Sequence, residues 1–239
     1  MAAVMWWAKV KRIQFVVAIK RSLLRLLKYS AVTDTSKSSF IYLASQSPRR
    51  AELLAQLGVS HRLLLADQDE DAEGLEDIHG QEAPATYVRR VTQLKLAAAV
   101  LRARKRNLAE APILCADTTV ALGRQILGKP HDARAAGQML QALTDKTHRV
   151  LTAVGIAWCA GKKIHTHFAL SQSQVTFAKL TKREIEDYIA TGEPFGKAGS
   201  YGVQGKAAAF ISKISGSYSG VMGLPLHETA GLLKMAKAL

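Results

Sequence analysis

The segment LASQSPRRAELLAQLG, residues 43–58, is the feature that most constrains the fold of this 239-residue chain. It predicts a short buried strand, a Ser-Pro turn and a helix capped by Ser47. Arg49 and Arg50 then lie at the positive end of the helix dipole, which disfavours cations unless an anion lies between them. The segment favours a phosphate site, with two solvent-facing arginines as the alternative.

Strand-like and helix-like segments alternate along the rest of the chain, which predicts an α/β fold. Strands are expected over 40–44, 62–66, 113–122, 149–158, 163–180 and 208–214, the fourth and fifth joined as a hairpin through 159–162. Further helices are expected over 84–105, from 132, over 181–192 after a capping box, and from 226 to the end. Cys115 and Cys159 lie in apolar strand-like runs and are expected to be small core residues.

The first 39 residues differ in composition from the rest. They carry eight Lys or Arg and one Asp, whereas residues 40–239 carry 25 basic and 18 acidic residues. Residues 1–28 fit an amphipathic helix at a membrane surface, a targeting peptide or a misassigned start, and 33–39 form a polar linker. We therefore expect an extension and linker over 1–39 and one domain over 40–239. No run of 18 apolar residues lacks charges, so no transmembrane helix is expected. The two cysteines fit a reducing compartment, and a cytoplasmic protein is expected.

Acidic residues offer the first candidates for chemistry. Asp117 follows four apolar residues, and a buried carboxylate needs a metal, a base or a water as partner. Mg²⁺ binding or water activation would suit it, and an Asx-turn is the alternative. The acidic loop 67–77 adds Glu70 as an oxygen ligand, although such runs are usually just solvated.

Two glycine-rich segments complete the set of candidates. The loop GEPFGKAGSYGVQG, residues 192–205, allows close backbone approach to a ligand, and Lys197 and Gln204 supply polar groups. An ordinary flexible connection is the alternative. Neither this loop nor GSYSGVMGLP, residues 216–225, has the spacing of a Walker A or dinucleotide motif. His165 and His167 share a strand face, which is expected to be solvated.

Taken together, these segments resemble the Maf family of nucleotide pyrophosphatases. The matching segments lie in family order: LASQSPRRAELLAQLG, CADTTV, ILGKP, HRVLTAVGI, GEPFGKAGSYGVQG and GSYSGVMGLPLHET. Details of the last two resemble the dTTP/UTP branch rather than the 7-methyl-GTP branch. The resemblance implies an elongated mixed α/β sheet with flanking helices and a central cleft, similar to inosine triphosphate pyrophosphatases. It also implies hydrolysis of nucleoside triphosphates to monophosphate and diphosphate, and is consistent with house-cleaning of non-standard nucleotides.

The resemblance further implies roles for individual residues. Asp117 matches the family's general base, and Arg49, Thr118 and Gln204 match its selectivity positions. Other polar positions of the cleft, which would bind substrate or metal, are matched by Ser45, Arg50, Lys95, Lys129, Glu193 and Lys197.

A divalent cation, Mg²⁺ or Mn²⁺, is the cofactor that the resemblance implies. Asp117 would hold it together with Glu70 or Glu193. The chain departs from the family at Gly196, where many members have an aspartate, and residues 1–39 have no family counterpart.

Two alternatives belong to other functional classes. The family has been associated with septum inhibition, so the chain could be a nucleotide-binding regulator of cell division that acts through a partner without turnover. Residues 1–28 suggest a membrane-surface or nucleic-acid protein, but the rest of the chain lacks any helix-turn-helix, zinc or RNA-binding signature. We therefore expect a nucleoside triphosphate as the partner, no nucleic acid, and no membrane contact outside the extension; the resemblance also allows a homodimer.

Overall fold

The computed structural model describes residues 39–67, 70, 74–161 and 163–239, so that nearly all of the predicted extension lies outside it. The strands are β1 (Ile41–Leu43), β2 (His61–Leu63), β3 (Ile113–Leu122), β4 (Gln125–Leu127), β5 (Thr147–Ala160), β6 (Lys163–Phe177) and β7 (Ile211–Ser215). The α-helices are α2 (Pro48–Gln56), α3 (Pro84–Lys105), α4 (Ala133–Leu143), α5 (Lys182–Ala190), α6 (Tyr218–Met222) and α7 (Leu226–Met235). Short 3₁₀ turns are η1 (Gly74–Glu76), η2 (Ala198–Ser200) and η3 (Lys206–Phe210).

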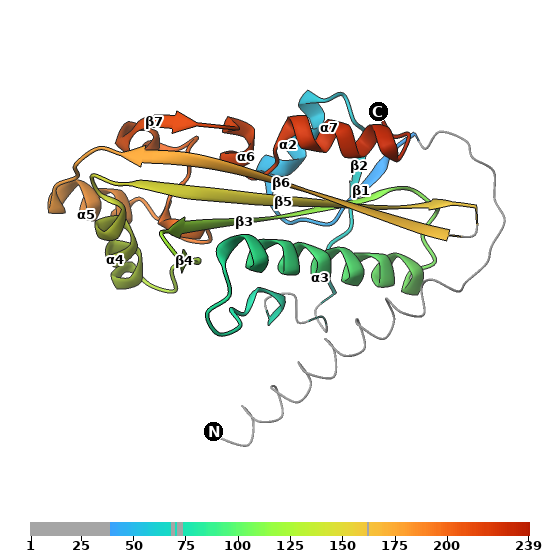
Figure 1. Cartoon of the computed structure of the whole chain (residues 1–239), viewed down its shortest axis with the longest axis horizontal. Helices are drawn as coiled ribbons and strands as arrows, with labels where there is room; N and C mark the ends of the chain where they lie inside the picture. Colours follow the sequence, from blue (N-terminus) through green and yellow to red (C-terminus); the bar gives the residue numbers. More distant parts are fainter. Residues whose placement is uncertain (1–38, 68–69, 71–73, 162) are drawn as a thin grey trace, which may run out of the picture.

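A seven-stranded mixed sheet forms the body of the molecule. Its strand order is β2-β1-β3-β5-β6-β7, and β4 pairs with β3 outside this path. Strand β1 runs parallel to β2 and β3, whereas the other pairs are antiparallel. The long β5–β6 hairpin extends along the whole molecule and gives it an elongated shape (Figure 1). The predicted mixed α/β architecture is confirmed.

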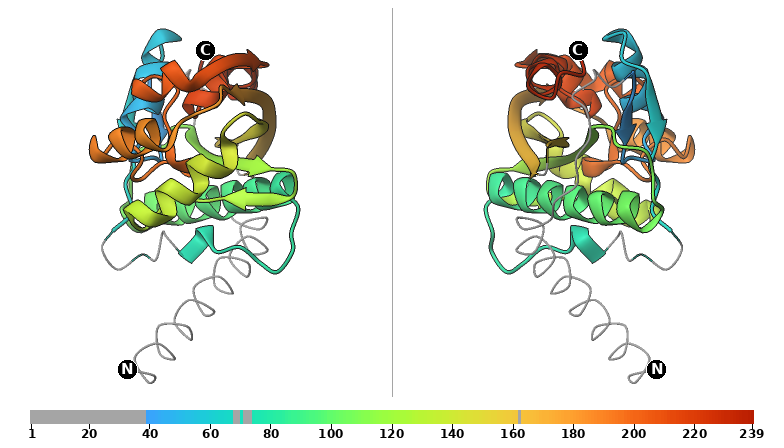
Figure 2. Two further views of the ribbon diagram at one scale, coloured as in Figure 1. Left: turned by 90° about the vertical axis from the view of Figure 1, so that its left-hand side faces the viewer. Right: turned by 90° about the vertical axis from the view of Figure 1, so that its right-hand side faces the viewer.

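Helices cover both faces of the sheet. Helix α3 lies along one face against β3 and β5, and α2 and α7 lie on the other (Figures 1 and 2). Helices α4 and α5 pack together at one end of the sheet. No helix within the described part of the chain is long and apolar enough to cross a membrane.

Side-chain alternation along β3 decides which residues reach which face. Cys115 packs in the cluster that contains Leu96 of α3, whereas Ala116 packs in the cluster that contains Leu53 of α2. Successive strand residues point to opposite faces, so Asp117 lies on the α3 side and Thr118 on the α2 side. Strand β3 thus places neighbouring polar side chains on both faces of the sheet.

A gap in strand pairing opens the sheet next to these residues. Strand β1 pairs with β3 at Ile113 and Leu114, and β4 pairs with it at 120–122, on the edge opposite β5. The stretch 115–119 therefore faces a region where the chain after β1 turns away into α2. Ligands of α/β proteins bind in such crevices beyond the carboxyl ends of strands.

Several sequence predictions need correction in detail. Cys115 is buried as expected, but Cys159 is exposed near the end of the hairpin, where cross-strand neighbours cover one side only. The strand expected over 208–214 begins as the turn η3, and the last helix ends at Met235. Strand β4 and helix α6 were not predicted, because each is too short to show periodicity. The exposure of His165 and His167 is confirmed; both rings stack on Trp158.

We predict that Gly199→Ala destabilises the fold more than Gly58→Ala does. Both glycines have φ of +69°, which costs an alanine about 1–2 kcal/mol. A Cβ on Gly199 would also lie 2.8 Å from the buried Val120 side chain, whereas Gly58 has open space. Overpacking adds roughly 1–3 kcal/mol, so urea unfolding should separate the two variants. Equal losses would show that η2 does not pack tightly on β3.

Candidate active site

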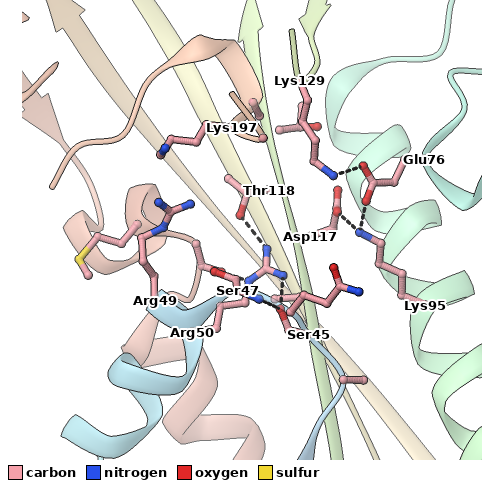
Figure 3. A pocket seen from close by; sticks show the side chains of 18 of the residues that line it. Ser45, Ser47, Arg49, Arg50, Glu76, Lys95, Asp117, Thr118, Lys129 and Lys197 are labelled. Atoms are coloured by element: carbon pink, nitrogen blue, oxygen red, sulfur yellow. Dashed lines mark hydrogen bonds and ion pairs between the residues drawn. The ribbon is translucent and has the colours of Figure 1, made fainter. Parts of the chain in front are cut away.

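A pocket of about 520 Å³ lies at the gap in the sheet. Its wall includes the turn after β1, the start of α2, the turn η1, the middle of β3 and the segment around η2. Figure 3 shows that polar side chains from these elements point toward one another across it. The volume falls within the range of small-molecule sites.

Asp117 forms an ion pair with Lys95 on the α3 side of the pocket. Lys95 Nζ donates to Asp117 Oδ1 at 2.6 Å and to Glu76 Oε1 at 2.7 Å (Figure 3). Asp117 is only 6% exposed, so the pair neutralises a charge that would be costly alone. Burial alone would lower the pKa of Lys95, but attraction from Asp117 and Glu76 raises it, so the ammonium persists at neutral pH.

Glu76 connects Lys95 to a second lysine across the pocket mouth. Its Oε2 accepts from Lys129 Nζ at 2.8 Å (Figure 3). Burial opposes ionisation of Glu76, yet the two lysines together lower the pKa of its carboxyl. The chain Asp117–Lys95–Glu76–Lys129 is thus a continuous row of alternating charges.

Arg50 ties three segments together on the α2 side. Its guanidinium donates to the Gly223 carbonyl at 2.8 Å, to Ser45 Oγ at 3.1 Å and to Thr118 Oγ1 at 3.4 Å. Burial lowers the pKa of Arg50, although Asp117 and other acids oppose this. All three hydrogen-bond acceptors are neutral oxygens, so they do not neutralise the guanidinium. Its positive charge therefore contributes to the electrostatic potential of the pocket.

Arg49 and Lys197 lie at the other end of the pocket (Figure 3). The Arg49 side chain forms no ion pair with any described residue, while Lys197 Nζ donates to the carbonyl oxygen of Glu193. Burial, together with repulsion from Arg49, lowers the pKa of Lys197. An anion between the two cations would relieve this repulsion.

Ser45 and Ser47 shape the turn that precedes α2. Ser47 occupies the predicted N-cap position, but its side chain makes no capping hydrogen bond. Its backbone N–H instead donates to Ser45 Oγ at 3.1 Å. The start of α2 lines the pocket, as the sequence predicts for an anion site.

Three of the predicted site residues lie off the pocket wall. Glu70 accepts from Arg102 through both oxygens, at 2.8 and 2.6 Å. Glu193, near the start of the glycine-rich loop, accepts from Tyr188 Oη at 2.9 Å and from the Lys206 N–H at 3.0 Å. Gln204 is exposed on that loop, whose residues Tyr201 and Val203 do line the pocket. The pocket brings together Ser45, Arg49, Arg50, Lys95, Asp117, Thr118, Lys129 and Lys197.

Sequence reasoning missed Glu76 as a residue of the pocket. The acidic loop 67–77 was singled out, but Glu76 has no pattern that distinguishes it from the loop's other acids. Only its position at η1, close to α3, brings it to Lys95. Gly223 was also missed, because its carbonyl contact with Arg50 joins residues 173 positions apart.

Comparison with known proteins identifies the family of the chain. A family model described as Maf-like protein matches residues 40–236. The chain belongs to the Maf family. The dTTP/UTP pyrophosphatase of Albidiferax ferrireducens is 61% identical over 197 residues, which are 82% of this chain and 96% of that protein. The proteins of that name from Polaromonas sp. and Cupriavidus pinatubonensis are 59% and 58% identical, over 83% of this chain and 96% and 97% of their own lengths.

We predict that Arg50→Lys destabilises this Maf protein, whereas Arg49→Lys does not. A lysine keeps the charge but cannot reach Ser45, Thr118 and Gly223 with a planar fork. Loss of these hydrogen bonds should cost about 1–3 kcal/mol, measured by thermal or urea unfolding without nucleotide. Equal stability of the two variants would contradict a structural role for Arg50.

Proposed function

We propose that this chain hydrolyses nucleoside triphosphates, dTTP and UTP above others, to the monophosphate and diphosphate. The supporting observation is the buried carboxylate of Asp117, which pairs with Lys95 in a nucleotide-sized pocket that further cationic side chains line. Family membership and relatives named dTTP/UTP pyrophosphatase support the same reaction.

The charge balance of the pocket suits a polyanion. Among the residues that the structure describes, six Lys and Arg line it, together with the carboxylates of Asp117 and Glu76. One of the six, Arg102, is neutralised by an ion pair with Glu70, which does not line the pocket. The remaining excess of three positive charges favours a triphosphate over neutral ligands.

The chemistry follows from the position of Asp117 among these cations. Its carboxylate would orient and deprotonate a water molecule. The water oxygen would then form a bond to the α-phosphorus while the bond to the α,β-bridging oxygen breaks, and diphosphate would leave with that electron pair. Arg49, Lys95, Lys129 and Lys197 would bind the phosphate chain and stabilise charge on its oxygens. Catalysis would therefore consist mainly of positioning and neutralisation.

A divalent cation fits this pocket only if substrate supplies part of its coordination. Across residues 39–67, 70, 74–161 and 163–239, no group of three or more His, Cys, Asp and Glu is placed to hold a metal. Mg²⁺ is commonly bound by one or two carboxylates together with phosphate oxygens, and Asp117 would supply one on the wall. Glu70 and Glu193, the other predicted ligands, would first have to leave their present protein partners. When bound, the cation would neutralise phosphate charge.

Base selection requires a group that reads the base edge, because phosphate contacts are the same for every nucleotide. Gln204 offers a donor and an acceptor, which match the imide edge shared by thymine and uracil. Its loop neighbours Tyr201 and Val203 already line the pocket. We therefore keep Gln204 as the proposed selectivity residue.

Replacement of the proposed base should abolish most turnover. We expect Asp117→Asn to lower kcat for UTP by roughly 10²–10⁴-fold, the range for loss of a general base. Lys95 would retain Glu76 as its partner, so the variant should still fold, which circular dichroism checks. Diphosphate release at a near-normal rate by the folded variant would refute this role.

Removal of the Gln204 amide should affect some nucleotides more than others. We predict that Gln204→Ala lowers kcat/KM for dTTP and UTP by about 1–3 kcal/mol in transition-state terms. Turnover of ATP should change little in the same variant. A uniform loss with all nucleotides would make Gln204 a scaffold residue of its loop.

A direct assay separates this proposal from a regulator without turnover. Incubation of the full chain with dTTP, UTP and Mg²⁺ should release diphosphate in amounts well above the enzyme concentration. Binding without product would favour the regulator. A homodimer stays a prediction that analytical ultracentrifugation can test.

A further inference from the structure

The Glu76 carboxylate lies between two lysines of the pocket. Its two oxygens accept from different lysines, Oε1 from Lys95 at 2.7 Å and Oε2 from Lys129 at 2.8 Å. Both lysines are proposed to bind the phosphate chain of the substrate. Figure 3 shows the Glu76 carboxylate between the two ammonium groups, on the same side of the pocket as Asp117.

The backbone around Glu76 is anchored to α3. Tyr87 Oη donates to the Glu76 carbonyl oxygen at 2.9 Å, and Arg90 donates to the Asp77 carbonyl oxygen at 2.7 Å. Leu75, next to Glu76, is buried in a cluster with Leu94. The backbone at Glu76 is therefore held in place by the packing of its own segment, which keeps this residue next to the two lysines.

The side chain can nevertheless leave the lysines while the backbone stays in place. It is 25% exposed, and Lys129 at the pocket mouth is 51% exposed. A triphosphate at Lys95 and Lys129 would lie beside the carboxylate and repel it, since like charges a few ångströms apart are unfavourable. Rotation of the side chain toward solvent removes that repulsion.

We propose that Glu76 is an internal competitor of the phosphate chain, a residue that occupies Lys95 and Lys129 before substrate binds and is displaced by it. This inference rests on the proposed function, because it takes the two lysines as phosphate ligands. Displacement costs every anion that uses these lysines part of its binding free energy. Glu76 therefore weakens substrate and product alike, and its return to the lysines favours release of product.

The test compares Glu76→Gln with the wild-type chain and with Glu82→Gln. Glu82 belongs to the same segment, but its oxygens bind Arg90 and lie away from the pocket, so the control loosens the segment without removing a pocket charge. The probes are inorganic diphosphate, UMP and uridine, measured by isothermal titration calorimetry. These ligands require no turnover, so the measurement is separate from the test of the proposed function.

We expect Glu76→Gln to lower the Kd of diphosphate roughly tenfold, which corresponds to about 1.4 kcal/mol. The Kd of UMP should fall in the same direction, that of uridine should not change, and Glu82→Gln should match the wild type. In steady-state assays the KM for UTP should fall while kcat does not rise, the pattern of a change in uniform binding.

Two results would overturn the inference. Weaker binding of diphosphate by Glu76→Gln would show that Glu76 orients the lysines for the ligand and does not compete with it. An unchanged Kd would show that the phosphate chain does not use Lys95 and Lys129. If the wild type binds diphosphate but does not hydrolyse UTP, the proposed function fails while the effect of Glu76 on anion binding can still be measured.

Discussion

The ion pair between Lys95 and Asp117 is the interaction on which the site depends. A carboxylate in the middle of β3 is too deeply buried to be tolerated alone, because an unpaired buried charge costs several kcal/mol. The 22-residue helix α3, which packs on the face of the sheet where Asp117 lies, supplies Lys95 as the counter-ion. The pair therefore couples the packing of α3 on the sheet to the chemistry of the pocket, and Cys115 and Leu96 pack beside it in the same interface.

The opposite side of the pocket is organised by Arg50. Its fork joins the turn after β1, the strand β3 and the segment before α7 through Ser45, Thr118 and Gly223. Thr118 continues this network to Thr152 on β5, at 2.9 Å. The motif around residues 43–58 thus contains two arginines with different surroundings: Arg50 is held by protein oxygens, whereas Arg49 lines the pocket.

Much of this arrangement could be predicted from local sequence. The strand over 113–122, the helix over 84–105 and the capping box of α5 are confirmed, because each has a strong periodic or capping signal. Contacts over long sequence separations could not be predicted. The partners of Glu70, Glu76 and Glu193 depend on how η1, α3 and the glycine-rich loop pack, and no spacing within the acidic loop indicates which carboxylate meets a lysine.

Isotope labelling tests whether water attacks the α-phosphorus of a nucleotide bound in the pocket around Asp117. Hydrolysis of UTP in H₂¹⁸O, followed by mass spectrometry of the products, locates the attacked phosphorus. We expect one ¹⁸O atom in UMP and none in the diphosphate. Label in diphosphate or in inorganic phosphate would place the attack at the β- or γ-phosphorus and contradict the proposed reaction.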